Sequence, residues 1–123
     1  MTTSQSLGAV LLVEDEALVR YAAAEALRAA GWEVLEASSG EHAVALLRSE
    51  QLIHLIFTDI QLAGTLNGWD VAEAGRMSQA ELPVIYTSGN SADRSRRVDR
   101  SLFFEKPYHV VNVVEACCRL VSK

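Results

Sequence analysis

The chain has 123 residues, half of them apolar, which is enough for one domain with its own hydrophobic core. Its formal net charge is −5 at pH 7, which argues against direct nucleic-acid binding, because proteins that contact phosphates normally carry net positive charge. No apolar run approaches the roughly 20 residues that cross a bilayer, and residues 1–7 lack the Lys or Arg of a signal peptide. We therefore expect a cytoplasmic protein that does not enter membranes, with a flexible tail over 1–7 and one domain over 8–123.

Five short apolar runs are typical of strands that are buried on both faces of a sheet. They cover residues 9–13, 33–37, 53–58, 83–87 and 102–104. The stretches between and after them predict helices near residues 19–30, 38–49, 68–78, 90–99 and 110–121. The fourth of these stretches is poorly apolar, so we expect that helix to be short or irregular. Strict alternation of strands and helices predicts an α/β fold in which about five helices in total cover the two faces of a parallel sheet.

Local signals mark the ends of several helices, taken in chain order. Gly31 follows the first helix, where a left-handed residue is favoured. Ser38 with Glu41 three residues later is typical of a capping box that opens the second helix. Asn67 is a suitable cap for the third. Gly75 inside that helix costs about 1 kcal/mol relative to alanine, which is tolerable if the helix packs closely there.

Polar side chains gather where the predicted strands end. Glu14 and Asp15 follow the first strand, Asp59 follows the third, Thr87 ends the fourth, and Lys106 comes just after the fifth. Ligands of open α/β sheets bind beyond the carboxyl ends of the strands. We therefore expect carboxylate, hydroxyl and ammonium groups from four parts of the chain to meet at one edge.

This set of groups suits phosphoryl chemistry. Carboxylates crowded at one edge raise one another's pKa unless a cation neutralises them. Oxygen ligands without His or Cys favour Mg²⁺ or Mn²⁺ over Zn²⁺. Lys106 and Thr87 supply a positive charge and a hydroxyl donor for phosphate oxygens. Asp59, which follows the central strand, is the best candidate for a phosphoryl acceptor that forms an aspartyl phosphate.

Four segments then carry a resemblance to a known family: Val13–Glu16, Phe57–Ile60, Tyr86–Gly89 and Glu105–Tyr108. Together they resemble the receiver domain of bacterial two-component response regulators, and the resemblance runs from about Val10 to Val121. It implies a flavodoxin-like, doubly wound sheet with the strand order 2-1-3-4-5. It also implies a phosphorylation-dependent signalling protein, not an enzyme, whose partners are a sensor histidine kinase or a histidine phosphotransfer protein.

The resemblance implies a role for each matching residue. Asp59 would accept the phosphoryl group from a histidine of the partner. Asp15 and the backbone carbonyl of Gln61 would bind Mg²⁺ directly, together with Asp59, and Glu14 would act through a metal-bound water.

Three further residues would bind the phosphoryl group or respond to its presence. Thr87 would bond a phosphoryl oxygen, and Lys106 would pair with the phosphate. Phe103 occupies the position of the aromatic switch residue, which swings inward when the threonine moves. Phe103 lacks the hydroxyl of the tyrosine often found at that position, so a phenolic hydrogen bond cannot be part of the switch.

The sequence departs from the family pattern in two segments. Ala63 stands where the family usually has proline, and Gly64–Leu66 makes the loop after the third strand one residue longer. The segment from Thr87 to Lys106 is shorter than usual, so the fourth helix is expected to be short or irregular. Arg94, Arg96, Arg97 and Arg100 lie in this segment, and we interpret them as a solvated helix face or a patch that docks a partner.

Two alternative functions stay open. A phosphatase with an aspartyl-phosphate intermediate, of the haloacid dehalogenase type, usually has a second aspartate two residues after the nucleophile, where this chain has Gln61. A pseudo-receiver would bind its partner without phosphorylation. With no output domain in this sequence, we expect a stand-alone receiver, monomeric or weakly dimeric, that binds another protein or serves as a relay or phosphate sink between kinases. Cys117 and Cys118 match no redox or metal spacing, and we expect the first in the core and the second near the surface.

Overall fold

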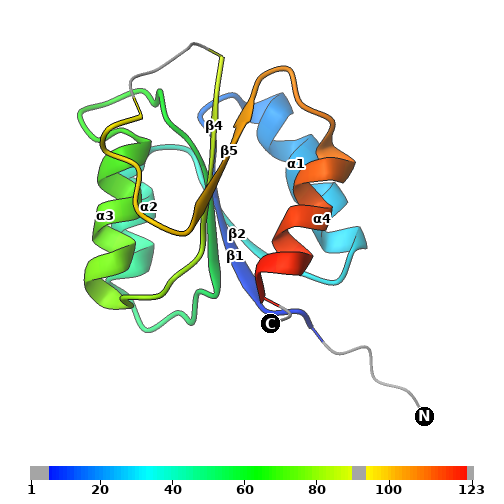
Figure 1. Ribbon diagram of the computed structural model, residues 1–123, viewed down its shortest axis with the longest axis horizontal. Helices are drawn as coiled ribbons and strands as arrows, with labels where there is room; N and C mark the ends of the chain where they lie inside the picture. The colour runs from blue at the N-terminus through cyan, green and yellow to red at the C-terminus, as the bar shows by residue number, and fades with distance from the viewer. Residues whose placement is uncertain (1–5, 90–93, 122–123) are drawn as a thin grey trace.

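The computed structural model describes residues 6–89 and 94–121. Its centre is a parallel sheet of five strands in the order β2-β1-β3-β4-β5, which confirms the predicted flavodoxin-like α/β fold (Figure 1). The three middle strands are buried along their whole length, which explains why their sequences are almost continuously apolar. The strands are β1 (Ala9–Val13), β2 (Glu33–Ala37), β3 (Leu55–Asp59), β4 (Val84–Ser88) and β5 (Ser101–Glu105).

Helices cover both faces of the sheet (Figure 1). Successive residues of a strand point to opposite faces, so Val10 packs in the layer of α1 and α4, and Leu11 packs in the layer of α2 and α3. The four helices of the described residues are α1 (Ala17–Ala29), α2 (Gly40–Leu47), α3 (Gly68–Ser78) and α4 (Val110–Val121).

The two cysteines lie on α4 as expected, with Cys117 buried in the core and Cys118 half-buried, and both are free thiols. Among the described residues, none of the helices has both the length and the apolar character that crossing a bilayer demands.

The tail expected over 1–7 falls mainly on residues 1–5, which lie outside the described residues. Leu7 is tied to the domain, because its N–H donates to the carbonyl of Gly31 at 3.0 Å.

The cap of α2 differs from the prediction. Ser39, not Ser38, is the N-cap, and its hydroxyl accepts from the N–H of His42 at 3.0 Å. Two adjacent serines offer the same local chemistry, so spacing alone did not distinguish them. Glu41 does not complete a capping box, because its carboxylate binds the loop after β3.

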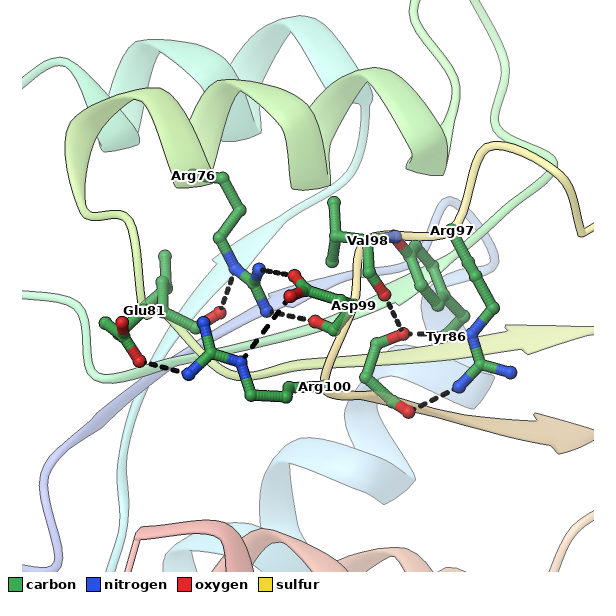
Figure 2. A network of polar contacts seen from close by, with 9 residues as sticks. Arg76, Glu81, Tyr86, Arg97, Val98, Asp99 and Arg100 are labelled. Carbon is green, nitrogen blue, oxygen red and sulfur yellow. Dashed lines mark hydrogen bonds and ion pairs between the residues drawn. The ribbon is translucent and has the colours of Figure 1, made fainter.

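The helix predicted over 90–99 is wrong over the part that the structure describes. Residues 90–93 lie outside that part, and residues 94–100 form a turn and bends that lead into β5. Val98 is the one apolar residue of this stretch, and its N–H donates to the buried hydroxyl of Tyr86 at 3.0 Å (Figure 2). With so little apolar surface to bury, the stretch is held by hydrogen bonds rather than by an amphipathic helix face.

Arginine side chains fasten this stretch, which we call the 94–100 segment, to its surroundings. Arg76 of α3 donates to the carbonyls of Leu82 and Asp99 and pairs with the Asp99 carboxylate at 2.9 Å (Figure 2). Arg100 pairs with Glu81, as Figure 2 also shows.

The other arginines of the segment are also engaged. Arg96 pairs with Asp70 and Glu73 of α3. Arg94 pairs with Glu105 of β5. The basic cluster therefore is not a helix face, because residues 94–100 form a turn and bends. Arg94, Arg96 and Arg100 pair with acidic residues of neighbouring segments, and Arg97 donates to the hydroxyl and the carbonyl of Ser101.

Close packing explains two glycines of α3. A Cβ on Gly75 would lie 2.5 Å from Cδ1 of Ile56, so the close approach expected there is confirmed. A Cβ on Gly68 would lie 2.3 Å from the backbone carbonyl oxygen of Asp59. Asn67 caps the helix as predicted, in a full capping box with Asp70. The first turn of α3 thus sits directly against the end of β3.

We predict that Gly68→Ala lowers the free energy of unfolding by about 2–3 kcal/mol, because the clash is with backbone that cannot rotate away. Urea denaturation followed by circular dichroism measures this loss. Gly89→Ala is the matched control, since a Cβ at Gly89 meets nothing within 4 Å. Equal stability of the two variants would contradict the packing described here.

Candidate functional site

The parallel register brings four strand ends to one edge of the sheet. Asp59 of β3 lies beside Thr87 of β4, and Ser88 of β4 lies beside Glu105 of β5. Val13 of β1 pairs with Thr58, so the residues that directly follow β1 lie at the same level. The edge predicted from the sequence is therefore present, and it brings the ends of β1, β3, β4 and β5 to one level.

Three carboxylates meet at this edge. Glu14, Asp15 and Asp59 each place an oxygen within 4.8 Å of the others. Glu14 is 3 % exposed and Asp59 is 7 % exposed, whereas Asp15 is half-buried. Backbone groups fix Glu14 further, because its Oε2 accepts from the N–H of Glu16 at 3.1 Å.

Lys106 lies between two of these carboxylates. Its Nζ donates to Oδ2 of Asp59 at 2.8 Å and to Oε1 of Glu14 at 3.2 Å. The backbone of Lys106 is anchored as well, since its N–H donates to the carbonyl of Ser88 at 2.8 Å. The ammonium group therefore neutralises part of the negative charge that the acidic edge collects.

The electrostatics follow from burial and from these contacts. Burial raises the pKa of Glu14, and the charge of Asp59 raises it further, against the lowering by the Glu16 N–H and by Lys106. Burial alone would lower the pKa of Lys106, but its hydrogen bond to Asp59 and the two nearby carboxylates outweigh this and raise it to about 12. Lys106 is therefore fully charged at neutral pH.

The loop after β3 contacts the acidic residues through its backbone. The N–H of Ala63 donates to Oδ2 of Asp15 at 2.9 Å. The N–H of Gln61 faces Oδ1 of Asp59 at 3.4 Å, a long contact. Gln61 thus lies beside the acceptor candidate, and the role of its carbonyl as a metal ligand stays a prediction.

The two switch candidates lie on neighbouring strands. Thr87 is 1 % exposed and lies in the wall behind Asp59. Phe103 is half-buried on β5, where its ring packs against Tyr86 at 6.3 Å between centroids and lies under the guanidinium of Arg94 at 3.6 Å. The structure does not bring Phe103 into contact with the acidic cluster, and its switching role stays a prediction.

Tyr108 belongs to the site although the sequence analysis gave it no role. It lines the same wall as Glu14, Asp59 and Thr87, and its ring packs edge-on against Phe57 at 6.0 Å. Burial raises its pKa, as do the charges of Glu14 and Asp59. The sequence could have pointed to Tyr108, because this residue lies two positions after Lys106, inside the fourth segment that carries the resemblance.

An apolar groove of about 600 Å³ opens next to the site. It lies between α1 and the segment that joins β5 to α4, and Lys106 and Tyr108 form part of its wall. Leu18, at its rim, is 84 % exposed. A molecule that reaches the acidic edge from this side would therefore meet apolar surface.

The donor set fits a hard divalent cation. Its ligands are carboxylate oxygens, and the described residues contribute no His or Cys to the cluster. Such a set suits Mg²⁺ or Mn²⁺ rather than Zn²⁺. Glu14, Asp15 and Asp59 are the side chains that could hold it.

Comparisons with known proteins point to one family. The model of the response regulator receiver domain matches residues 10–117. The chain is 36 % identical over 91 residues to the alginate biosynthesis transcriptional regulatory protein AlgB of Pseudomonas aeruginosa. The aligned region covers 74 % of this chain but only 20 % of AlgB. The chain therefore spans about a fifth of that relative.

Two solved structures show the same fold. A response regulator receiver protein from Sinorhizobium medicae is 32 % identical with a TM-score of 0.88, over 92 % of this chain and 93 % of that one. The receiver domain of the hybrid histidine kinase CckA is 31 % identical with a TM-score of 0.81, over 94 % of this chain and 100 % of that one.

We predict a pH-dependent difference between the wild type and Glu14→Gln in EDTA. Because burial raises the pKa of Glu14, its carboxyl group ionises in the unfolded state before it ionises in the folded state as the pH rises above 4.5. The free energy of unfolding of the wild type therefore falls with pH, whereas the uncharged glutamine of the variant makes no such contribution. The free energy of unfolding of E14Q relative to the wild type is therefore expected to increase as the pH rises from 4.5 through the raised pKa of Glu14, measured by urea denaturation.

Glu33→Gln, at an exposed glutamate of β2, controls for the loss of one charge. A difference between wild type and E14Q that does not change with pH would contradict the burial cost assigned to Glu14.

Proposed function

The chain belongs to the response regulator receiver family, and on that premise we propose that it accepts a phosphoryl group on Asp59 in a Mg²⁺-dependent reaction. The observation that carries the proposal is the contact of Asp59 Oδ2 with Lys106 Nζ at 2.8 Å, beside two further carboxylates within 4.8 Å. A nucleophile, a positive charge and a set of metal ligands thus share one small site. A surface acid would have none of these neighbours.

The transfer is an in-line displacement in which the protein mainly positions groups. A carboxylate oxygen of Asp59 forms a bond to phosphorus, while the bond from phosphorus to the donor breaks and the donor keeps the electron pair. Lys106, charged at neutral pH, is placed to pair with the phosphoryl oxygens during the transfer, and the Thr87 hydroxyl can donate a hydrogen bond to one of them. Bound Mg²⁺ would supply further positive charge to these oxygens.

Glu14, Asp15 and the carbonyl of Gln61 would hold the metal beside Asp59. Lys106 bridges Glu14 and Asp59 in this structure, so it compensates part of their charge before any cation binds. Metal binding would then add to this compensation rather than create it, because the carboxylates are already assembled.

The donor is proposed to be a phosphohistidine of a sensor kinase or of a phosphotransfer protein. CckA, whose receiver domain has the same fold, is a hybrid histidine kinase, which supports this class of partner. Asp59 is almost buried, so a protein donor must bring its histidine to the edge itself. The apolar groove beside Lys106, with Leu18 at its rim, is the surface that such a donor would meet.

We predict that incubation with acetyl phosphate and Mg²⁺ adds one phosphoryl group, detected by intact mass. Asp59→Asn removes the acceptor oxygen's charge and is expected to abolish the addition, and EDTA is expected to prevent it. Asp99→Asn is the matched control, because Asp99 is an exposed aspartate paired with Arg76.

The alternatives give different results in the same experiment. Steady hydrolysis of a generic phosphomonoester would favour the phosphatase and would contradict our proposal. A protein that takes no phosphoryl group but binds Mg²⁺ would be the pseudo-receiver.

We predict that Leu18→Glu slows transfer from a phosphorylated histidine kinase domain by about tenfold, since a charge would replace exposed apolar contact surface. The donor is any purified kinase that phosphorylates the wild type in a screen. The rate with acetyl phosphate is expected to stay the same, because that donor needs no docking surface. Met77→Glu is the matched control: Met77 is 89 % exposed and lies on α3, on the other side of the sheet. Equal slowing by both variants would exclude the groove as the docking surface.

A further inference from the structure

Glu41, which the sequence pattern had assigned to a capping box, binds the loop after β3 instead. Its Oε2 accepts from the Thr65 hydroxyl at 2.6 Å, from the Thr65 N–H at 2.9 Å and from the Leu66 N–H at 3.3 Å. The hydrogen bonds from the Thr65 hydroxyl and N–H lower the pKa of Glu41 to about 2. An ionised carboxylate on α2 therefore ties the helix to the loop. We call this contact the Glu41 clasp.

Glycines on both sides make room for the clasp. A Cβ on Gly40 of α2 would lie 2.6 Å from the carbonyl oxygen of Leu66. A Cβ on Gly64 would lie 2.8 Å from Oε1 of Glu41, and Gly64 has a φ of +96°, in the left-handed region. A side chain at Gly40 would press on the backbone of Leu66 and force the helix and the loop apart, whereas one at Gly64 would strain the backbone and displace the Glu41 carboxylate. Two of the three donors are backbone N–H groups, so the clasp joins one side chain to the loop backbone, unlike an ion pair between two mobile surface chains.

The clasped loop continues directly into the acidic site. Gly64 alone separates Thr65 from Ala63, whose N–H donates to Oδ2 of Asp15 at 2.9 Å. Restraining Thr65 therefore restrains the donor that orients Asp15. Outer groups that orient a ligand in this way contribute strongly to metal affinity.

We propose that Glu41 is a positioning residue for the metal and phosphoacceptor site, acting through residues 63–66. The proposal rests on the proposed function, since it concerns the same site. This loop has no proline over residues 60–67, and it contains Gly64. Both features add backbone freedom that must be lost when the loop is ordered, and the clasp supplies part of that constraint.

The first test is amide hydrogen exchange of the metal-free protein by NMR. Glu41→Ala removes the acceptor of Thr65 and Leu66, so their amides will exchange faster whatever the clasp does for the site. The proposal requires that the Ala63 amide, whose acceptor is Asp15, also exchanges about fivefold or more faster. Glu25→Ala is the matched control, an exposed glutamate of α1 that pairs with Arg28 at 3.7 Å.

The second test is the affinity for Mg²⁺, measured by isothermal titration calorimetry. We expect E41A to bind Mg²⁺ about threefold to tenfold more weakly than the wild type, below the full effect of deleting a direct outer-shell partner. The rate of phosphorylation by acetyl phosphate is then expected to fall at limiting Mg²⁺ and to recover at saturating Mg²⁺. This separation distinguishes positioning from a general loss of structure.

Glu41→Gln keeps an oxygen acceptor without the charge, so it is expected to restore part of the Ala63 protection and of the Mg²⁺ affinity. It also carries the test if E41A does not fold. Faster exchange confined to Thr65 and Leu66, with unchanged Ala63 exchange and Mg²⁺ affinity, would overturn the proposal. A wild type that takes no phosphoryl group would instead overturn the proposed function, and the Ala63 amide would then decide the clasp alone.

Discussion

The burial of two carboxylates beside one ammonium is the constraint on which the structure depends. Glu14 and Asp59 are almost inaccessible to water, and leaving such charges unpaired would be costly. Lys106 pairs with both, although it lies 92 residues from Glu14 and 47 residues from Asp59 in the chain. Only a fold that aligns distant strand ends at one edge can satisfy the three groups together. The parallel sheet does so, because its strands all end at the same level.

The rest of the architecture keeps that edge from rearranging. β1, β3 and β4 are buried on both faces, so the residues that follow them emerge from rigid supports. Gly68 lets the first turn of α3 rest on the backbone of Asp59. The loop between them is held through Asp15 on one side and Glu41 on the other. Asp59 is thus surrounded by groups that restrict its position, which is what the proposed phosphoryl transfer would require.

The sequence was informative where the physical cause is local. Buried strands leave apolar runs, and polar residues at their ends identify the edge that holds Asp59 and Lys106. It was uninformative where a side chain has two local chemistries or a distant partner. Glu41 fits a capping box by spacing, yet it binds Thr65, 24 residues away. The 94–100 segment has a helix-like length, but its conformation is decided by acids on α3 and β5 and by the hydroxyl of Tyr86.

β4 connects the acidic edge to the 94–100 segment through two successive residues. Thr87 lies in the wall behind Asp59, whereas Tyr86 points to the opposite face, packs against Trp69 at 4.7 Å and accepts a hydrogen bond from Val98. Neighbouring residues of a strand share a peptide unit, so a shift of the backbone at Thr87 moves the Tyr86 ring as well. Because interiors are densely packed, that ring cannot move without its neighbours. Two successive residues of β4 thus join the wall behind Asp59 to the 94–100 segment, although the described residues of that segment form no regular helix.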